Sequence, residues 1–168
     1  ALRAKGRDFH PVDFAFRCGE PATVIGANMG GKTVALKTLC MLQYLYQFGF
    51  ALPVASALMC PFDLIWFCIG DEQDERSGLS SFSAEMLRID RAVASVGQGK
   101  RVLLLIDEPA RTTNPVEGTA LVAALLQRLA DQPDLALVMS THYTVAHTGR
   151  CWRVMGLVPG SRGREMDY

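Results

Sequence analysis

Several features that mark large classes of proteins are absent from this sequence of 168 residues. Neither sign of charge is in excess, since Lys and Arg together number 17 and so do Asp and Glu. A basic surface that binds DNA through its charge alone is therefore not expected, and a nucleic-acid partner would not be held by this domain alone. No signal or transit pattern opens the sequence, and Lys, Gln, Gly and Pro interrupt the longest apolar run, residues 36–54, so a membrane span is not expected.

Cysteine pairs with metal-site spacing are also absent. The five cysteines are odd in number, scattered, and never spaced as CxxC: Cys18, Cys40, Cys60, Cys68 and Cys151. This pattern argues against a disulfide framework or a zinc site and is typical of reduced core thiols in a cytosolic protein. We therefore expect a cytoplasmic location.

The composition suits one domain. Hydrophobic residues make up 49% of the sequence, enough for a sizeable core, and the length fits a single domain over residues 1–168. The abrupt first and last residues lead us to expect a domain taken from a longer protein.

Short apolar stretches alternate with helical patterns along the chain, which predicts an α/β fold with a mostly parallel sheet and helices on both faces. Expected strands cover residues 13–18, 22–26, 63–70, 101–108, 135–140 and 152–158. The continuous apolar run at residues 63–70 is also compatible with a buried helix. Expected helices cover residues 34–47, 82–96 and 116–130.

The octapeptide GANMGGKT, Gly26 to Thr33, lies between an apolar strand and a helix. This is the pattern of a P-loop, in which backbone N–H groups bind phosphate oxygens at a helix N-terminus. Lys32 would reach the β and γ phosphates, and the Thr33 hydroxyl would bind Mg²⁺. The loop predicts a P-loop NTPase that uses a nucleoside triphosphate and Mg²⁺. Its predicted nucleotide-binding residues are Gly26, Ala27, Asn28, Met29, Gly30, Gly31, Lys32, Thr33 and Val34.

Two acids end the apolar stretch LLLIDE, and polar residues follow the next one. Ligands on open α/β sheets collect at the carboxyl ends of strands. We expect Asp107 to hold Mg²⁺ together with Thr33, and Glu108 to orient or deprotonate the attacking water. At the same edge, His142 is expected to contact the γ phosphate or the water. The predicted catalytic residues are Glu108, His142 and Lys32.

The serines in SGLSSFSAEM, Ser77 to Met86, allow two interpretations. Ser80 or Ser81 caps the next helix, or this helix N-terminus faces a phosphate. Because the chain already has one phosphate loop, that phosphate would belong to a second subunit.

The motifs GANMGGKT, SGLSSFSAEM, LLLIDE and STHY, in this order, resemble the ATPase domain of the MutS family, which is related to ABC-type ATPases. Asn28 and Met29 carry much of the likeness. The segments IGDEQ and TVALKTL look most like the bacterial branch not devoted to mismatch repair. The resemblance implies an ABC-ATPase-like fold and a homodimer with composite ATP sites.

The resemblance also implies roles for single residues. Ser80 matches the signature serine that closes the partner's site, Phe9 matches the aromatic residue that stacks on adenine, and Asn28 would lie against the phosphates at the dimer interface. After Glu108 the sequence departs from the family pattern, because Ala110 and Thr112 replace flexible glycines.

Two clients are compatible with this module. One is mismatched or branched DNA, bound through domains outside this sequence. The other is a cobalamin-dependent amino-acid aminomutase, which a chaperone-like ATPase would remodel or reactivate. The loop DEPARTTNP resembles MutS-like reactivases, whereas DNA-linked proteins dominate the family.

Overall fold

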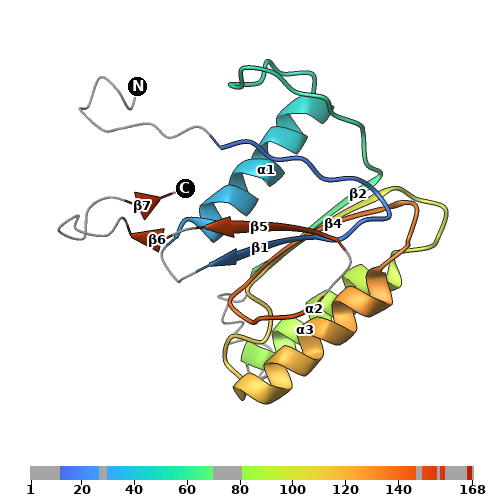
Figure 1. Ribbon diagram of the computed structural model, residues 1–168. Coiled ribbons are helices and arrows are strands. Elements are labelled where there is room, and N and C mark those ends of the chain that lie inside the picture. The colour runs from blue at the N-terminus through green and yellow to red at the C-terminus, as the bar shows by residue number, and fades with distance from the viewer. Residues whose placement is uncertain are drawn as a thin grey trace.

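The computed structural model describes residues 12–26, 30–69, 81–146, 149–154, 156–157 and 166–167. In this part of the chain, one parallel sheet has the strand order β2-β3-β4-β1-β5 (Figure 1). Its strands are β1 (Ala22–Gly26), β2 (Leu64–Ile69), β3 (Val102–Asp107), β4 (Leu135–Thr141) and β5 (Arg150–Val154). The helices are α1 (Lys32–Gln47), α2 (Ser81–Ala94) and α3 (Pro115–Leu129). A separate antiparallel pair joins β6 (Gly156–Leu157) and β7 (Met166–Asp167).

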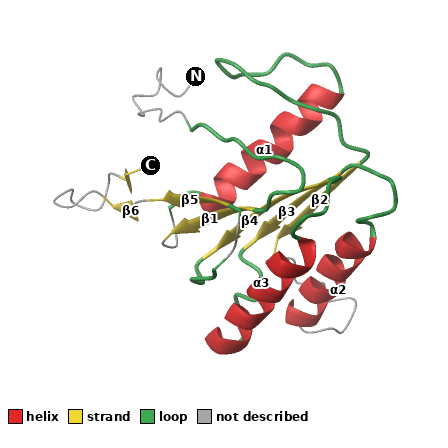
Figure 2. Cartoon of the chain, turned by 45° about the vertical axis from the view of Figure 1, so that its right-hand side comes forward, coloured by secondary structure: helices red, strands yellow, loops and turns green. Residues whose placement is uncertain are grey.

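The strand order explains where the helices lie. The chain passes from β1 across the sheet to β2 and then returns through β3 to β4. Crossovers between parallel strands are almost always right-handed, so opposite directions of travel place the connecting helices on opposite faces. Figures 1 and 2 show α1 on one face of the sheet and α2 and α3 on the other.

Local signals in the sequence determine the helix ends near the carboxyl edge. Gly31 precedes α1 with a φ of 85°, a left-handed conformation that costs glycine little. The Asn114 side chain caps α3 by accepting a hydrogen bond of 2.9 Å from the Val116 N–H, and Pro115 fills the first turn. Both helices therefore start close to the ends of the strands that precede them.

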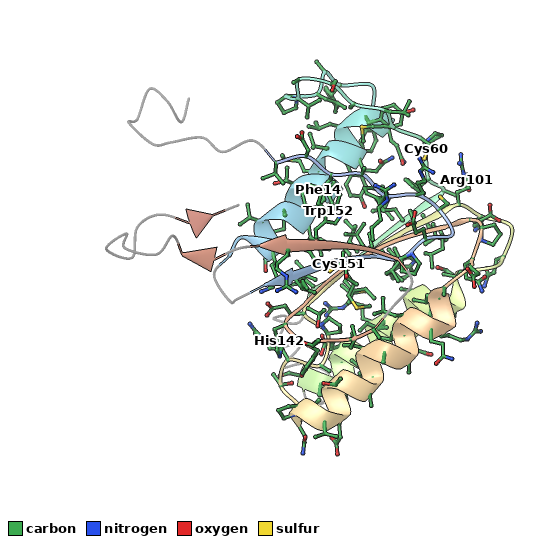
Figure 3. All side chains as sticks on the ribbon, viewed as in Figure 1. Phe14, Cys60, Arg101, His142, Cys151 and Trp152 are labelled. Atoms are coloured by element: carbon green, nitrogen blue, oxygen red, sulfur yellow. The ribbon has the colours of Figure 1, made fainter. Side chains whose placement is uncertain are left out.

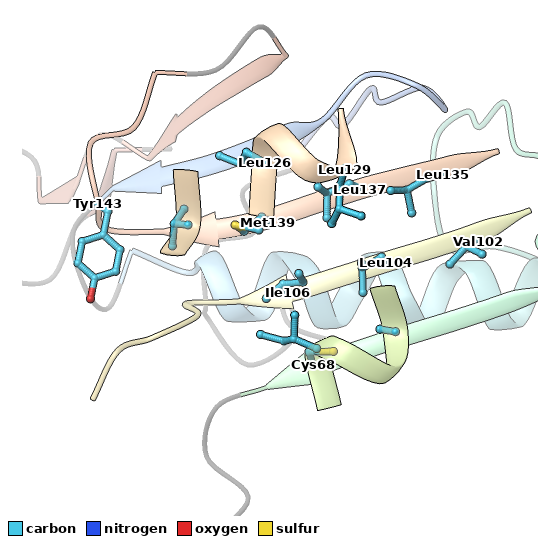
Figure 4. Close-up of a cluster of buried hydrophobic side chains, with 13 residues drawn as sticks. Cys68, Val102, Leu104, Ile106, Leu126, Leu129, Leu135, Leu137, Met139 and Tyr143 are labelled. Atoms are coloured by element: carbon cyan, nitrogen blue, oxygen red, sulfur yellow. The ribbon is translucent and has the colours of Figure 1, made fainter. Parts of the chain in front are cut away.

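The core consists of two layers on either side of β3. Leu104 and Ile106 face α2 and α3, whereas Leu103 and Leu105 face α1, as the two-residue repeat of a strand requires. All six residues of β3 are buried. Figure 4 shows the cluster on the α2 and α3 side, with Tyr143 at its end. A continuous aliphatic run in the sequence is thus a central strand covered on both faces.

Most predicted elements are confirmed. The strand at 22–26 matches β1, and the run at 63–70 is strand β2, not a buried helix. The three predicted helices match α1, α2 and α3, and the predicted strand at 152–158 is the edge strand β5, displaced toward the N-terminus.

The predicted strand at 13–18 is wrong. Arg17 and Glu20 form an isolated antiparallel bridge around Gly19, which has a φ of 81°. Phe14 and Phe16 pack against the α1-side core instead of pairing with a strand. Alternating aromatic residues therefore reflect burial against the sheet and not membership of it.

The predicted fold class is also wrong. We expected a complete P-loop NTPase fold of the ABC-ATPase-like kind. The structure is a small α/β domain whose described residues contain a five-stranded parallel sheet and three helices. Within these residues, 13–18 add no strand and the strands outside the sheet pair only as β6 and β7, so the elements that the structure describes are too few for that larger fold.

Two further features concern side chains and helix length. The cysteines are free, with Cys40 and Cys68 buried and Cys151 exposed, so the expectation of core thiols holds for only some of them. Among the helices that the structure describes, none combines the length and apolar composition that crossing a membrane requires.

Candidate functional site

The carboxyl ends of β1, β3 and β4 lie side by side. Asp107 at the end of β3 is in register with Ser140 of β4, and Thr141 of β4 is in register with Ile25 of β1. This register brings the residues after three separate strands to one edge of the sheet. The glycine-rich loop, the two acids and the STHY segment therefore meet there, although they are far apart in sequence.

Lys32 is the first residue of α1 and is almost completely buried, with 3% of its side chain exposed. Its Nζ donates a hydrogen bond of 2.7 Å to the Gly26 carbonyl and lies 2.9 Å from Glu108 Oε1. A buried ammonium group is tolerated only when it is paired and hydrogen-bonded. In this structure the lysine thus joins the end of β1 to the acid after β3.

Asp107 is held from two sides. Its Oδ2 accepts a hydrogen bond of 2.8 Å from Thr33 Oγ1, and its Oδ1 accepts one of 2.6 Å from Ser140 Oγ. The residue is 6% exposed, so these bonds replace the water that a surface carboxylate would have. The two hydroxyls fix the orientation of the carboxylate between α1 and β4.

The turn after β3 has an unusual backbone. Glu108 and Ala110 have φ values of 46° and 61°, in the left-handed region that residues with a Cβ rarely adopt. The Glu108 N–H donates to Ser140, at 3.0 Å from Oγ and 3.1 Å from the carbonyl oxygen. Ala110 therefore adopts a conformation that favours glycine, at a position where the family pattern has a flexible glycine.

His142 and Tyr143 follow β4 and differ sharply in exposure. His142 is exposed, and its ring centroid lies 4.1 Å from that of Tyr143. Figure 3 shows His142 on the side of the sheet that carries α2 and α3. Tyr143 is 7% exposed, and its hydroxyl donates a hydrogen bond of 2.9 Å to the Ala110 carbonyl.

The structure brings four predicted site residues into one connected cluster: Lys32, Thr33, Asp107 and Glu108. We call these four the edge cluster. Gly26 ends β1, Gly30 and Gly31 lie in the loop before α1, and Val34 lies in the first turn of α1 with 66% of its surface exposed. The predictions for Phe9, Ala27, Asn28, Met29 and Ser80 concern positions outside the described residues.

Sequence reasoning missed Ser140 and gave no role to Tyr143. Ser140 connects Asp107 to the Glu108 backbone, and Tyr143 connects the segment after β4 to the turn after β3. The signal that could have identified Ser140 is its place at the end of a central strand beside the strand that ends in two acids. That Ser140 bonds to Asp107, however, depends on the strand order, which cannot be read from the sequence alone.

A cavity of about 390 Å³ lies along α1 and shares no residue with the edge cluster. Its lining is mainly apolar: Lys37, Cys40, Met41, Tyr44, Leu45, Phe48, Phe50 and Phe67. The polar chemistry of the domain thus lies at the sheet edge and not in this hollow.

The sequence of this chain is similar to those of known proteins. The family model MutS domain V matches residues 22–149, more than half of the chain. The chain is 43% identical over 122 residues to "Endonuclease MutS2" of Thermomicrobium roseum, covering 71% of this chain and 15% of that protein. It is 38% identical over 141 residues to "Endonuclease MutS2" of Synechocystis sp., covering 71% and 16%.

A mismatch repair protein matches as well. "DNA mismatch repair protein MutS" of Bacillus cytotoxicus is 35% identical over 120 residues, covering 71% of this chain and 13% of that protein. The chain thus spans between 13% and 16% of the length of these relatives. The match to MutS domain V covers every helix and strand from β1 through β4, and with them the whole edge cluster. This chain therefore belongs to the MutS family and contains its domain V.

Proposed function

We propose that this domain binds and hydrolyses ATP with Mg²⁺ at the edge cluster. The observation that carries the proposal is the Lys32–Glu108 ion pair of 2.9 Å beside the Thr33–Asp107 hydrogen bond of 2.8 Å. These contacts support the proposal, because they join within one cluster a cation that would bind phosphate, two oxygens that would bind a metal and a carboxylate that would bind water. Membership of the MutS family, whose proteins are ATPases, supports the same chemistry.

The loop from Gly26 to Val34 would hold the phosphates. The N–H groups in the first turn of a helix have no partner within the helix, and the positive end of the helix dipole lies there, so the start of α1 favours an anion. Lys32 begins this helix, and its ammonium group pairs with Glu108 in this structure. On nucleotide binding, Lys32 exchanges the carboxylate for the β and γ phosphate oxygens, which releases Glu108.

The residues at this edge fit Mg²⁺. Thr33 and Asp107 provide two hard oxygen donors, and Mg²⁺ usually takes one or two protein ligands while water and phosphate oxygens supply the others. Among the described residues, no group of three or more His, Cys, Asp or Glu side chains forms a complete cage. When bound, Mg²⁺ would neutralise charge on the transferring phosphoryl group.

Glu108 is the general base of the proposal. Its carboxylate orients the attacking water and accepts a proton from it, and its partial burial, with 14% exposure, limits competing solvation. His142 follows β4 at the same edge and is exposed, so it is free to approach the γ phosphate or the water. Phe9 is proposed to stack on adenine, on the family resemblance alone.

A direct test is ATP turnover by the full-length protein and its Lys32→Met variant. Lys37→Met is a matched control, because Lys37 lies on the exposed side of α1. We expect Lys32→Met to lower kcat/KM by about 10²-fold or more, as loss of a preorganised charge contact predicts, and Lys37→Met to keep normal turnover. Equal turnover in all three proteins would contradict the proposed site.

We further propose that two subunits share each ATP site, with Ser80 of one subunit closing the site of the other. Co-expression of Lys32→Met and Ser80→Ala subunits tests this arrangement. Each variant alone has little turnover, whereas a heterodimer keeps one site with an intact Lys32 and an intact Ser80. Recovered turnover supports the shared site; a mixture as inactive as the separate variants contradicts it.

The client that we propose is DNA, bound through domains outside this sequence. Relatives of this chain are named for mismatch repair and as endonucleases, and the balanced charge of 17 and 17 leaves DNA contact to other domains. The relatives include both MutS and MutS2 proteins, so the comparisons do not separate the two branches. None of these relatives supports an aminomutase client.

Stimulation by DNA tests the client. ATP turnover of the full-length protein is measured alone, with fully paired duplex, and with mismatched or branched duplex at several salt concentrations. We expect stimulation by mismatched or branched DNA that weakens as salt rises. Turnover unaffected by any of these duplexes would leave the ATPase intact and exclude the DNA client.

A further inference from the structure

The hydroxyl of Tyr143 joins two segments that the edge cluster depends on. It donates a hydrogen bond of 2.9 Å to the Ala110 carbonyl, and both residues are buried. The Tyr143 backbone is fixed in turn, because its N–H donates a hydrogen bond of 3.0 Å to Thr141 Oγ1 at the end of β4. A rigid strand end therefore holds the turn that carries Glu108.

This turn needs such support. Glu108 and Ala110 both lie in the left-handed region, with φ values of 46° and 61°, where a Cβ is unfavourable. Ser140 accepts the Glu108 N–H at one end of the turn, and Tyr143 binds the Ala110 carbonyl at the other. The Ala110 carbonyl also accepts a hydrogen bond of 3.2 Å from the Thr113 N–H, but that bond lies within the same segment and does not tie it to β4. Without the Tyr143 bond, the backbone would relax more easily toward negative φ and move the Glu108 side chain.

Gly118, near the start of α3, leaves room for the Tyr143 hydroxyl. A Cβ added at Gly118 would lie 2.2 Å from the Tyr143 hydroxyl oxygen and 2.5 Å from Cζ, so any larger residue would displace the ring. The ring packs in the core beneath α2 and α3, and its hydroxyl points out of that cluster (Figure 4). Gly118 and Tyr143 thus form a matched pair under the turn.

We propose that Tyr143 is a positioning residue for ATP hydrolysis, which holds the Glu108–Ala110 turn in its left-handed conformation and so directs the Glu108 carboxylate at the attacking water. The proposal rests on the function proposed above. Burial and, to a smaller degree, the charge of Glu85 raise the pKa of Tyr143. The hydroxyl therefore keeps its proton, and remains a donor, throughout the physiological pH range.

Removing the hydroxyl alone tests the proposal. In the full-length protein, Tyr143→Phe keeps the ring in the core but loses the bond to Ala110. We expect kcat to fall about tenfold with KM for ATP unchanged, since one buried hydrogen bond is lost. Tyr44→Phe on the exposed side of α1 is the matched control and should keep both constants.

A second substitution separates positioning from simple loss of stability. Glycine adopts a positive φ without the strain of alanine, so Ala110→Gly in the Tyr143→Phe protein should restore kcat to within about threefold of the wild type. Gly118→Ala provides an independent approach, because it displaces the hydroxyl while removing no polar group. It should lower kcat about as much as Tyr143→Phe, within about twofold. Thermal unfolding of each variant confirms that the proteins remain folded at the assay temperature.

The outcomes distinguish the two proposals. A wild-type protein without ATP turnover contradicts the proposed function and the role of Tyr143 with it. An active wild type with full kcat in both Tyr143→Phe and Gly118→Ala overturns the positioning role and leaves the ATPase standing. Low kcat in Tyr143→Phe that Ala110→Gly does not restore also overturns it. Low kcat, unchanged KM and recovery in the double variant support it.

Discussion

Polar side chains lie at both ends of the parallel sheet, but they differ in exposure and in hydrogen-bond partners. At the amino edge, Asp63 precedes β2 and its Oδ2 accepts a hydrogen bond of 2.8 Å from the Arg101 N–H, in front of β3. Both residues are exposed. At the carboxyl edge, Lys32 and Asp107 are only 3% and 6% exposed and bond to side chains from other elements.

The difference lies in what the contacts satisfy. At the amino edge, a side chain completes the hydrogen bonding of a neighbouring backbone, and water could replace it. At the carboxyl edge, charged groups are withdrawn from water and held by each other, which costs free energy unless the arrangement is paired. Burial of paired charges, more than polarity, therefore distinguishes the edge at which we propose the ATP site.

The largest effect should come from removing one charge of the buried pair. Glu108→Gln keeps the size and polarity of the side chain but removes the carboxylate that we propose as the general base. We expect kcat for ATP hydrolysis to fall by about 10²–10⁴-fold, the range for loss of a general base. Glu20→Gln is the control, because Glu20 lies before β1 at the amino edge and pairs with Arg150 at 3.6 Å. An equal fall in kcat in the two variants would mean that both edges affect turnover alike, which contradicts the difference between the edges.

A smaller effect should follow from loosening the support of Asp107. Ser140→Ala removes the hydrogen bond of 2.6 Å to Asp107 Oδ1. If Asp107 binds Mg²⁺ as proposed, loss of a group that orients its carboxylate should raise the Mg²⁺ concentration for half-maximal turnover by about 10–100-fold. A Mg²⁺ titration of ATP turnover measures the shift. Ser95→Ala removes a serine that bonds Trp66 and the Ala92 carbonyl at the end of α2, and it should leave the Mg²⁺ midpoint unchanged.

A thiol in the core between the two edges should make the free energy of unfolding depend on pH. Burial raises the pKa of the Cys68 thiol to about 11. Because the folded state disfavours the thiolate, its contribution to stability is complete below the unfolded pKa near 8.5 and is lost as pH rises toward the folded value. We expect the free energy of unfolding to fall by about 1 kcal/mol from pH 9 to pH 10 through this group. Chemical denaturation at both pH values should show a smaller decrease in Cys68→Ala; an identical decrease would contradict the assignment.

The smallest effect is expected at the amino edge itself. Asp63→Ala removes the acceptor of the Arg101 N–H, but water reaches this exposed position. The free energy of unfolding should fall by about 0.5–1.5 kcal/mol, with unchanged ATP turnover. Turnover reduced more than about tenfold would mean that the amino edge also supports the site.

The sequence predicted the elements near the site well because each carried its own local signal. The aliphatic run of β3 and the Asn114–Pro115 start of α3 are examples. It failed at residues 13–18, where alternating aromatic residues pack on the sheet without joining it.

The residues of the candidate site could be proposed in part for the same reason. Lys32, Thr33, Asp107 and Glu108 belong to contiguous motifs, so each could be assigned without knowing the fold. The roles of Ser140 and Tyr143 depend on strand order and on a left-handed turn at Ala110, which arise only when distant segments pack together.

We propose that Glu108 holds Lys32 until phosphate takes its place, and the ATP affinity of the Glu108→Gln variant tests this exchange most directly. Equilibrium binding of ATP is measured for the wild-type, Glu108→Gln and Glu20→Gln proteins under the same Mg²⁺ concentration. Removing the charge that competes for Lys32 should strengthen ATP binding by about five- to tenfold, in line with the modest free energy of a single charged contact. The control should bind as the wild type does. ATP binding that is weakened by Glu108→Gln would contradict the account.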